Sequence, residues 1–462
     1  MTTKKLTDYI KQSISVQDTK KAEQPKPTQT RVQFKKETKF QETSIGKIPK
    51  EWKIAKLGSI CRFKRGFSYR STDITDERTS LRFITIDDIE KEGGLKRYAK
   101  KVYIKNPSAV DPEFLLDIGD LLIANTDMTK GFIIGAPILI KNLGERCAYS
   151  MDLTKLIFDK TNIHSEFLYY YLMHPQVRRF MKSSAQGTNV LHLNHEIIKN
   201  LFIPIPSLTE QKVIAEILSM VDLAIDRVRR LVERAEKLKM GLMQELLTKG
   251  IGHKEYKETP IGKIPKEWKI VKLSNIARII MGQSPPSETY NVHQEGLPFL
   301  QGKEEFGLIY PKLKLYTTQP IKIAEQGDIL IAVRAPVGDV NIAPFKMCIG
   351  RGLAALRFDE TRAHNLFYFY YLQYIKKRIE SLSKGTTFKA ITKEDLENLI
   401  VSLPRLEEQR AIAEVLSTVD EYIESLRAKL EHLERVKVWL MDVLLTGKVR
   451  AVVESISGAT NG

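Results

Sequence analysis

The sequence predicts an α+β protein with two tandem domains separated by two long antiparallel coiled-coil helices, related by an internal pseudo-twofold repeat. Two observations carry this prediction. The nonapeptide GKIPKEWKI occurs at 46–54 and again, unchanged, at 262–270. In addition, a heptad-like pattern of apolar residues follows each copy of the domain, along 207–250 and 405–446. Nine identical letters do not recur by chance, so the chain contains a duplicated unit.

The repeat extends through most of the chain, and its offset can be followed. The two copies are 216 positions apart at Trp52 and Trp268. The offset falls to 200 at LTKLIFD (153–159) and LAALRFD, and to 198 at TEQKVIAEIL (209–218) and EEQRAIAEVL. A period near 200 residues is too long for a solenoid, so each copy is expected to be a complete domain with a connector.

These matches define the expected domain layout. Each domain mixes short β-like runs such as GDLLIAN and GDILIAV with Gly and Pro turns. The expected segments are a flexible basic N-terminal extension at 1–43, a first domain at 44–206, a central long helix at 207–250, a second domain at 251–404, a C-terminal long helix at 405–446 and a tail at 447–462.

Each domain also contains an aromatic helical stretch, SEFLYYYLMHPQVRRFM (165–181) and HNLFYFYYLQYIKKRI (364–379). The aromatic residues lie at helical spacing. This spacing favours a role in the core over one as platforms for base stacking.

The connectors are expected to be long helices with coiled-coil seams. Ser207 and Glu210 have the spacing of a capping box, and Gly250 and Gly447 are placed to end the helices. In a head-to-tail duplication, a pseudo-twofold makes the helices antiparallel. The predicted seams are Ile214, Ile217, Val221, Ala224, Val228, Leu231, Ala235, Leu238 and Leu242, and Ile412, Val415, Val419, Ile423, Leu426, Leu430, Leu433, Val436 and Leu440.

The charge distribution favours an anionic partner. The chain has a net charge of +17. Residues 44–206 have 25 basic and 18 acidic side chains, and residues 249–404 have 23 and 16, so both blocks have an excess of +7. Nucleic acid is the usual partner of such a surface, and solubility alone is the alternative reading. The N-terminus lacks the apolar core of a secretory signal and no apolar run could cross a bilayer, so a cytoplasmic location without a membrane is expected.

The motifs of common catalytic sites are missing from the sequence. It has no GxxxxGK[ST] phosphate loop and no GxGxxG after a strand. The segment Ser284-Pro285-Pro286-Ser287 approaches the (D/N/S)PP(Y/F) signature of amino-methyltransferases but lacks its aromatic residue. Cys61, Cys147 and Cys348 have neither CxxC nor metal-ligand spacing and are expected in the core. The sequence therefore favours a binding protein without a catalytic, metal or cofactor site.

The combined motifs resemble the specificity subunits of type I restriction–modification systems. These motifs are the duplicated α+β domain, the helix start P-x-L-x-EQ-x-x-IA-x-[IV]-L (Pro206–Leu218 and Pro404–Leu416) and the helix end LLT (246–248 and 444–446). The IGKIPKEWKI segment and the GTN and GTT loops fit the same pattern, and the resemblance covers about residues 44–450.

The resemblance implies a non-catalytic subunit with two target recognition domains, each reading one half of a split sequence in double-stranded DNA. The helices would set the distance between the half-sites. Two methyltransferase subunits would dock on the helical region, and restriction subunits would complete the complex. S-adenosylmethionine, ATP and Mg would belong to those partner subunits.

Loops that differ between the copies are the candidate reading elements. GFSYRSTDIT (66–75) corresponds to GQSPPSETYN (282–291), and GTNVLHLN (187–194) to GTTFKAIT (385–392), so the target is expected to be asymmetric. Arg and Lys can contact phosphates or guanine, and Asn can contact adenine. The candidate DNA-contacting residues are Lys64, Arg65, Arg70, Lys130, Lys182, Thr188, Asn189, Arg334, Lys384, Thr386 and Lys389. For each charged candidate the alternative is a solvated surface charge, and the Gly-Thr loops can equally be structural turns.

Two other functions remain open at this point. The chain could be a scaffold that holds two proteins apart without DNA, although the matched positive excesses argue against it. It could also combine recognition with methyl transfer or cleavage in one chain, although the missing motifs argue against that.

Overall fold

The computed structural model describes residues 32–128, 131–383 and 390–453, which form two compact units. The N-terminal unit comprises residues 32–228 and 429–453, and the C-terminal unit comprises residues 229–428. Helix α6 (Leu208–Lys249) begins in the N-terminal unit and ends in the C-terminal unit, and α10 (Leu406–Leu445) does the reverse. Each unit therefore contains one α+β domain and a part of both long helices, as the repeat predicts.

The N-terminal domain is built on two four-stranded sheets and several smaller ones. The antiparallel sheet has the order β11 (Pro137–Leu139), β9 (Leu121–Ala124), β13 (Leu153–Phe158) and β5 (Cys61–Arg65). The mixed sheet has the order β12 (Cys147–Tyr149), β7 (Arg82–Ile84), β8 (Val102–Ile104) and β6 (Ile74–Thr75). The smaller sheets are β10 (Thr126–Asp127), β15 (Leu191–Leu193) and β14 (Ala185–Gln186); β4 (Lys53–Lys56) with β16 (Phe202–Ile205); and β2 (Phe40–Thr43) with β3 (Gly46–Pro49).

The C-terminal domain repeats this plan. Its antiparallel sheet has the order β20 (Ala277–Met281), β28 (Leu353–Phe358), β25 (Ile329–Ala332) and β26 (Val340–Ile342). A second sheet has the order β21 (Tyr290–Asn291), β23 (Tyr316–Thr317), β22 (Leu297–Leu300), β27 (Met347–Ile349) and β24 (Ile323–Ala324). Two small pairs complete the correspondence, β19 (Lys269–Lys272) with β29 (Ile400–Leu403) and β17 (Tyr256–Lys257) with β18 (Ile264–Pro265).

The aromatic stretches form helices, and their rings belong to the core. In the N-terminal unit the predicted single helix is broken at His174, because Pro175 starts a new one, giving α3 (Ser165–Met173) and α4 (Pro175–Ser183). The C-terminal unit has α7 (Asn365–Tyr374) and α8 (Lys376–Leu382). Short helices α2 (Leu57–Ile60), α5 (His195–Lys199) and α9 (Lys393–Glu397) cover the sheets. The buried aromatic residues are Phe167, Tyr169, Tyr170, Tyr171, Phe367, Tyr368, Phe369, Tyr370 and Tyr371.

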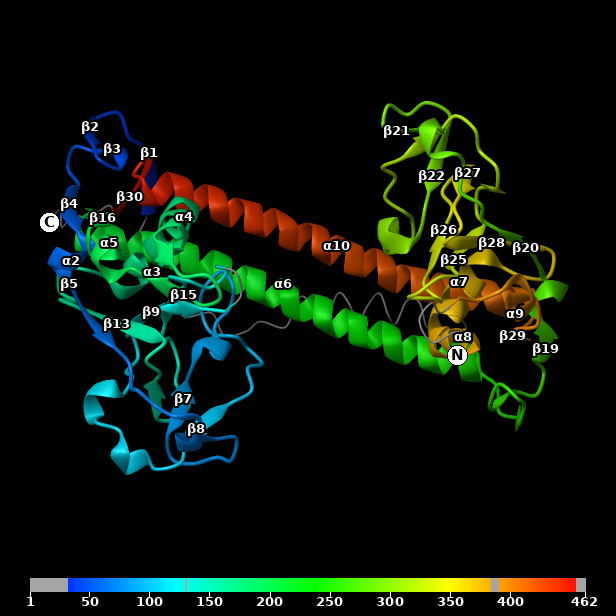
Figure 1. The fold of residues 1–462 in the computed structure, drawn as a ribbon, viewed down its shortest axis with the longest axis horizontal. Helices are drawn as coiled ribbons and strands as arrows, with labels where there is room; N and C mark the ends of the chain where they lie inside the picture. Colours follow the sequence, from blue (N-terminus) through cyan, green and yellow to red (C-terminus); the bar gives the residue numbers. More distant parts are fainter. Residues whose placement is uncertain (1–31, 129–130, 384–389, 454–462) are drawn as a thin grey trace, which may run out of the picture. The chain divides into compact units, whose positions relative to one another are not determined.

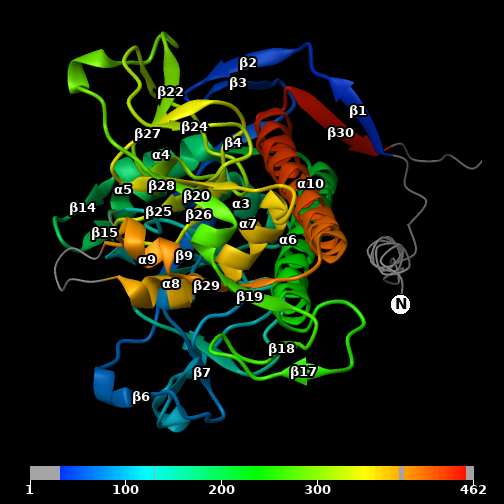
Figure 2. The same cartoon turned by 90° about the vertical axis from the view of Figure 1, so that its right-hand side faces the viewer.

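Within each unit the segments of α6 and α10 run antiparallel, side by side in both views of the ribbon (Figures 1 and 2). In the C-terminal unit, Glu236 contacts Arg427 at 2.6 Å, and Lys239 contacts Asp420, farther along α6 but earlier along α10. Gly250 and Gly447 follow the two helices at φ +66° and +72°, which is the left-handed conformation that ends a helix.

The predicted seam of α10 consists entirely of buried or half-buried residues, whereas the seam of α6 contains one error. Leu238 is 44% exposed, because the next residue, Lys239, takes the inward position by pairing with Asp420. Leu218 and Ile225 are buried in α6 although the prediction omitted them.

The chain ends also differ from the prediction. Residues 32–43 fall in the predicted flexible extension, but they form β1 (Val32–Lys36) and β2. Strand β1 pairs antiparallel with β30 (Val449–Val453), which lies in the predicted tail; Figure 2 shows the two strands side by side. The pairing has no local signal because the two strands are more than 400 positions apart. Residues 1–31 and 454–462 lie outside the described part.

All three cysteines are buried, as predicted for core residues. Burial raises the pKa of Cys61 to about 12 and that of Cys147 to about 11, which makes reactive thiolates unfavourable. Across the described residues, no cluster of His, Cys, Asp or Glu has the arrangement of a metal site, and no helix is long and apolar enough to span a bilayer.

Candidate nucleic-acid interface

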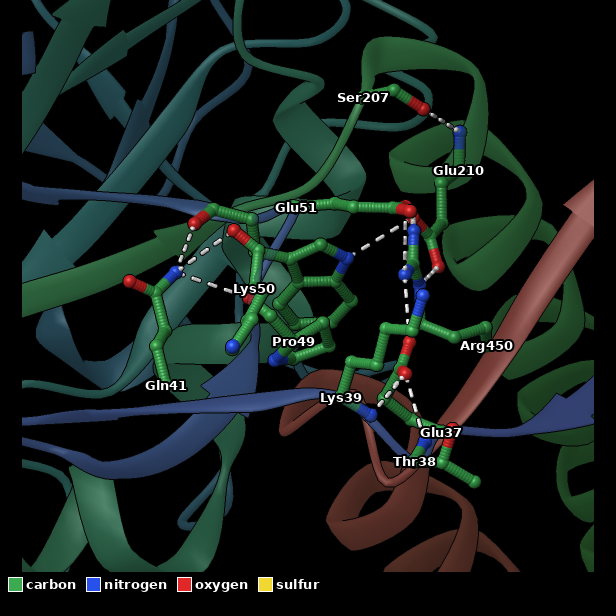
Figure 3. Close-up of polar contacts among 11 residues, drawn as sticks. Glu37, Thr38, Lys39, Gln41, Pro49, Lys50, Glu51, Ser207, Glu210 and Arg450 are labelled. Carbon is green, nitrogen blue, oxygen red and sulfur yellow. Dashed lines mark hydrogen bonds and ion pairs between the residues drawn. The ribbon is translucent and has the colours of Figure 1, made fainter.

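The repeated sequence motifs meet at a buried junction in each unit. In the N-terminal unit, Glu210 at the start of α6 accepts a hydrogen bond from the Trp52 indole at 3.1 Å and two from Arg450 at 2.6 and 2.8 Å. Arg450 also contacts Glu37 at 3.0 Å and Glu51 at 3.1 Å (Figure 3). Hydrogen bonding to Glu210 is the largest cause that raises the pKa of Arg450, so this guanidinium stays protonated among the glutamates around it.

This junction revises the expected capping box. The Ser207 hydroxyl accepts a hydrogen bond from the backbone N–H of Glu210 at 3.2 Å, as a cap does. The Glu210 carboxylate, however, binds Trp52 and Arg450. The Glu of the repeated EQ pair thus joins the helix to the repeated KEW segment.

The C-terminal unit has the same junction with a different cation. Glu408 accepts a hydrogen bond from the Trp268 indole at 2.9 Å and contacts His253 Nε2 at 2.8 Å. Its Oε1 atom also accepts a hydrogen bond from the N–H of Ile251 at 3.0 Å. A single imidazole therefore stands where the N-terminal unit has a guanidinium shared by several carboxylates.

The Gln of the EQ pair fixes each domain on its helix in the same way. Gln211 donates to the carbonyls of Asn162 and Pro206, and its side-chain oxygen accepts from the His164 N–H at 2.8 Å. Gln409 makes the equivalent bonds, with its oxygen accepting from His364 at 2.7 Å. Both glutamines are fully buried, so the two domains share one polar framework.

The candidate interface of the N-terminal domain is a rim of loops at one end of the antiparallel sheet. Strand β9 continues into β10, which pairs with β15 of the hairpin that carries Thr188 and Asn189 at its tip. Gly187 has φ +123°, and an added Cβ atom would collide with the Val190 carbonyl, so this tight hairpin requires glycine. The hairpin is therefore a structural turn, and it also exposes two polar side chains.

Arg65 reaches the same rim from the end of β5. Its Nε atom donates to the Met151 carbonyl at 2.8 Å, and that carbonyl also accepts from Asn125 at 3.3 Å. Asn125 is bonded at 2.9 Å to His195, whose pKa is lowered by burial first and then by Arg65 and Lys199. A neutral imidazole thus supports the rim beneath an exposed arginine.

A second loop of this rim is held from inside by two buried charged residues. Asp127 accepts from the N–H groups of Ile133 and Ile134 at 2.7 and 3.0 Å. Arg178 donates to the carbonyls of Ile134 and Phe132 at 2.7 and 3.3 Å, and burial lowers its pKa to about 10. Phe132 is 48% exposed at this loop, and the Lys182 ammonium lies 6.0 Å from its ring.

The structure thus brings four predicted residues to the rim: Arg65 at the end of β5, Lys182 in the last turn of α4, and Thr188 and Asn189 at the hairpin tip. Lys64 is an exception: its ammonium forms an ion pair with Glu113 and lies 5.2 Å from the Phe114 ring, because neighbouring strand residues point to opposite faces. Arg70 is exposed beside the short 3-10 turn at Ser71–Asp73, and its backbone N–H donates to Asp73. Lys130 lies outside the described residues.

In the described part of the C-terminal rim, one backbone pairing of the first copy recurs with different side chains. Arg334 follows β25 and its side chain is exposed. Its backbone forms an antiparallel β-bridge with Ala390, which corresponds to the pairing of Thr126 with His192 in the first copy. The loop after it is held by Asp339, which pairs with Lys303 and Lys376. Burial acts to raise the pKa of Asp339, but these ion pairs outweigh it and lower the pKa. Lys384, Thr386 and Lys389 lie outside the described residues.

Sequence reasoning missed Arg351 and Asn125. Arg351 is exposed, and its N–H donates to the Ser284 hydroxyl at 3.3 Å, which places it beside the GQSPPS loop. Aligning the segments YSMDLTKL and IGRGLAAL could have identified Arg351 as a candidate, because this arginine takes the place of Met151 in the other copy. Asn125 directly follows the repeated GDLLIA run, but its buried bond to His195 is visible only in the fold.

Comparisons with known proteins identify the family. The family described as type I restriction modification DNA specificity domain matches residues 49–236 and 265–435. A Methanocaldococcus jannaschii protein, named as the specificity subunit of the type I restriction enzyme MjaX, is 42% identical over 425 residues, covering 91% of this chain and 98% of that protein. The specificity subunit of the type I restriction enzyme MjaVIII from the same organism is 29% identical, with coverages of 91% and 98%.

Solved structures support the same fold. A chain from a study of complex assembly and conformational transition of the type I R-M system has a TM-score of 0.54 and 28% identity, covering 87% of this chain and 99% of that one. The S subunit of a type I restriction–modification system from M. genitalium has a TM-score of 0.58 at 17% identity, with coverages of 85% and 96%, which is a likeness of fold alone.

Proposed function

The chain belongs to the family of type I restriction–modification DNA specificity proteins, and we propose that its two rims read the two different halves of one split DNA target. The observation that carries this proposal is the repetition of one buried framework beneath two sets of exposed side chains. Glu210 and Glu408 hold equivalent tryptophans, whereas the buried Thr126 of one rim corresponds to the exposed Arg334 of the other. A shared scaffold with divergent loops suits two different half-sites.

The chain is a DNA-recognition subunit, and it is not itself the enzyme. Its partners are double-stranded DNA and the methyltransferase and restriction subunits of a type I system. We propose that two methyltransferase subunits dock on the helical region, one for each half-site, and supply the S-adenosylmethionine site. ATP and Mg would serve the restriction subunits. The complex would act in the cytoplasm, where its DNA substrate lies.

The proposed domain layout follows the sequence boundaries with one revision. The first recognition domain occupies 44–206 with the strands of 32–43 added, and the second occupies 251–404. The helices at 207–250 and 405–446 set the separation of the half-sites and hold the partner subunits. Residues 447–453 belong with the first domain through the pairing of β30 with β1.

The proposed DNA contacts differ in how well the structure supports them. In the first rim the favoured residues, all of them exposed, are Arg65, Lys182, Thr188 and Asn189. Arg334 is favoured in the second rim, where Arg351 is added. Lys130, Lys384, Thr386 and Lys389 remain candidates from the sequence, Arg70 is a candidate for phosphate contact, and Lys64 is the weakest because Glu113 already pairs with it.

The test is to express the partner methyltransferase with and without this chain in a host that lacks the system, and to map methylated adenines. Methylation at one bipartite motif only when the chain is present would support the proposal. Purified chain, free of partner subunits, should bind DNA in a salt-dependent manner and show no methyl transfer. Methylation of the same motif without the chain, or turnover by the pure chain, would overturn it.

A further inference from the structure

A partly buried polar triad connects three elements of the N-terminal unit. The Tyr170 hydroxyl on α3 donates to Asp222 Oδ2 on α6 at 2.8 Å. The Lys437 ammonium on α10 lies 2.7 Å from Asp222 Oδ1 and 5.9 Å from the centre of the Tyr170 ring. The triad therefore ties the recognition domain to both long helices at one point.

An equivalent triad lies in the C-terminal unit. The Tyr370 hydroxyl on α7 donates to Asp420 Oδ2 on α10 at 2.9 Å. The Lys239 ammonium on α6 lies 2.7 Å from Asp420 Oδ1 and 5.3 Å from the ring centre of Tyr370. Here the helices have exchanged roles, because α10 supplies the aspartate and α6 the lysine.

The two triads are copies of one device. Asp222 and Asp420 are 198 positions apart, which is the offset of the helical segments, and so are Lys239 and Lys437. The two tyrosines differ by 200, the offset of the aromatic helices. Each long helix thus carries one aspartate and one lysine, placed so that both pairs form together in a single antiparallel register.

Other registers would leave these charges without partners. If α10 slid by one heptad, Asp222 would face Leu430 or Leu444 in place of Lys437. Lys239 would face Ala413 or Arg427 in place of Asp420. The apolar residues of the seam do not discriminate in this way, since a leucine packs against many apolar neighbours. A buried polar residue in a coiled coil is a known means of selecting one register.

The triads are also shielded enough for this selection to be effective. The side chains of Asp420 and Lys239 are 1% and 13% exposed, and those of Asp222 and Lys437 are 29% and 19% exposed. Burial raises the pKa of Tyr170, so that it keeps its proton and donates. By contrast, the ion pair between Glu236 and Arg427 bridges the same helices with side chains 44% and 47% exposed.

We propose that the two Tyr–Asp–Lys triads are positioning devices that fix the helical register and the seating of each recognition domain, and thereby hold the gap between half-sites to one length. This inference rests on the proposed function, because a gap is defined only for a split target. The triads touch no DNA base in this role. Their effect is confined to the spacing, and the half-site sequences depend on the rims.

The experiment uses the full chain in complex with its methyltransferase subunits, and methylation mapping reports half-site sequences and gap separately. Asp222→Lys and Lys437→Asp each place like charges together, so the preference for the native gap should fall about tenfold or more, with new gap lengths methylated. The double variant, Asp222→Lys with Lys437→Asp, restores an ion pair and should restore the single gap. Half-site sequences should stay unchanged throughout.

The matched control is the same reversal at the exposed pair, Glu236→Lys and Arg427→Glu, which should leave the gap unchanged. Asp222→Asn and Tyr170→Phe provide milder variants if a charge reversal prevents folding; they should admit a second gap length with helix content intact by circular dichroism. Retention of the single native gap in these variants would overturn the inference. An equal loss of methylation at every gap length, not restored by the double variant, would also overturn it. If the wild-type complex methylates no split motif, the proposed function itself fails.

Discussion

The two recognition domains share a buried framework and differ at their rims, and the contrast separates what holds the fold from the surfaces that we propose read DNA. In both, a helix-start glutamate binds a tryptophan indole, and the following glutamine bonds the domain's own backbone. At the rims, Thr126 corresponds to Arg334, and Met151 to Arg351. The glutamate, tryptophan and glutamine of the helix start are therefore the same in both copies, whereas these two rim positions are occupied by exposed arginines in the second copy only.

The framework itself differs in one respect. The cation of the N-terminal junction is Arg450, which pairs with several carboxylates, whereas His253 pairs with Glu408 in the C-terminal one. A guanidinium keeps its charge under all ordinary conditions, but an imidazole can be neutral. The two junctions should therefore respond differently to the loss of their glutamate.

The largest expected effect is on the stability of the N-terminal junction. Glu210→Ala leaves the Arg450 guanidinium, whose side chain is 11% exposed, without its main partner. We expect a loss of about 3 kcal/mol in the stability of the N-terminal unit, toward the lower end for a broken buried pair because Glu37 remains. Hydrogen exchange on the full chain measures this unit by unit.

The matched variant Glu408→Ala should cost the C-terminal unit only about 1–2 kcal/mol, since an imidazole, unlike a guanidinium, is not obliged to carry a charge. Equal losses in the two units would contradict the difference assigned to the two cations. A loss spread over the entire chain would show that the units do not unfold separately.

The next effect concerns the helices that both domains share. Four residues inserted near Thr248 add about one helical turn, or about 6 Å, and rotate the downstream residues about the helix axis by about 40°. Because B-DNA rises about 3.4 Å per base pair, the gap should lengthen by one or two base pairs. Methylation mapping should find both half-sites unchanged. An altered half-site, or an unaltered gap, would show that the helices do not measure the spacing.

Substitutions in the rims should give the reverse result. Arg334→Ala removes an exposed arginine of the second rim and Arg65→Ala one of the first. Each should weaken or relax one half-site by about 1–3 kcal/mol if it contacts a base, with the gap kept. Lys47→Ala, an exposed framework residue paired only with Glu42, is the control and should change neither property. Relaxation of both half-sites by one substitution would contradict separate reading.

The smallest effect is a difference in acid sensitivity. Burial lowers the folded-state pKa of His195 below its usual value, so the unfolded chain binds this proton more readily. Stability contributed by the neutral imidazole is present above about pH 6.5 and is lost as the pH falls below it. His195 corresponds to Lys393 in the second domain, which has no imidazole at this position. The substitution His195→Gln should therefore reduce the rise in hydrogen exchange on acidification in the N-terminal unit only.

The repeat made most of the fold predictable. Apolar periodicity located both long helices, and the two equal copies implied one architecture used twice. Local patterns could not show that β1 pairs with β30, because those strands come from opposite ends of the chain. The pattern also misplaced Leu238, since an apolar count cannot foresee that Lys239 turns inward to meet Asp420.

The candidate site was predictable only in part. Exposed basic residues next to glycine turns could be named from the sequence: Arg65 is the last residue of β5, and Arg334 follows β25. Lys64 could not be separated from Arg65 without knowing that Glu113 lies beside it. The spacing predicts Glu210 only as a capping residue, because its partners Trp52 and Arg450 are distant in sequence and meet it only in the folded unit.

Mapping the adenines methylated by the complex that contains this chain is the most direct test of two different readers on one repeated framework. We expect one motif made of two unlike half-sites separated by a gap of fixed length. Substituting Arg65 should change one half and substituting Arg334 the other. A palindromic motif, or a single uninterrupted one, would contradict the conclusion that the two domains read different sequences.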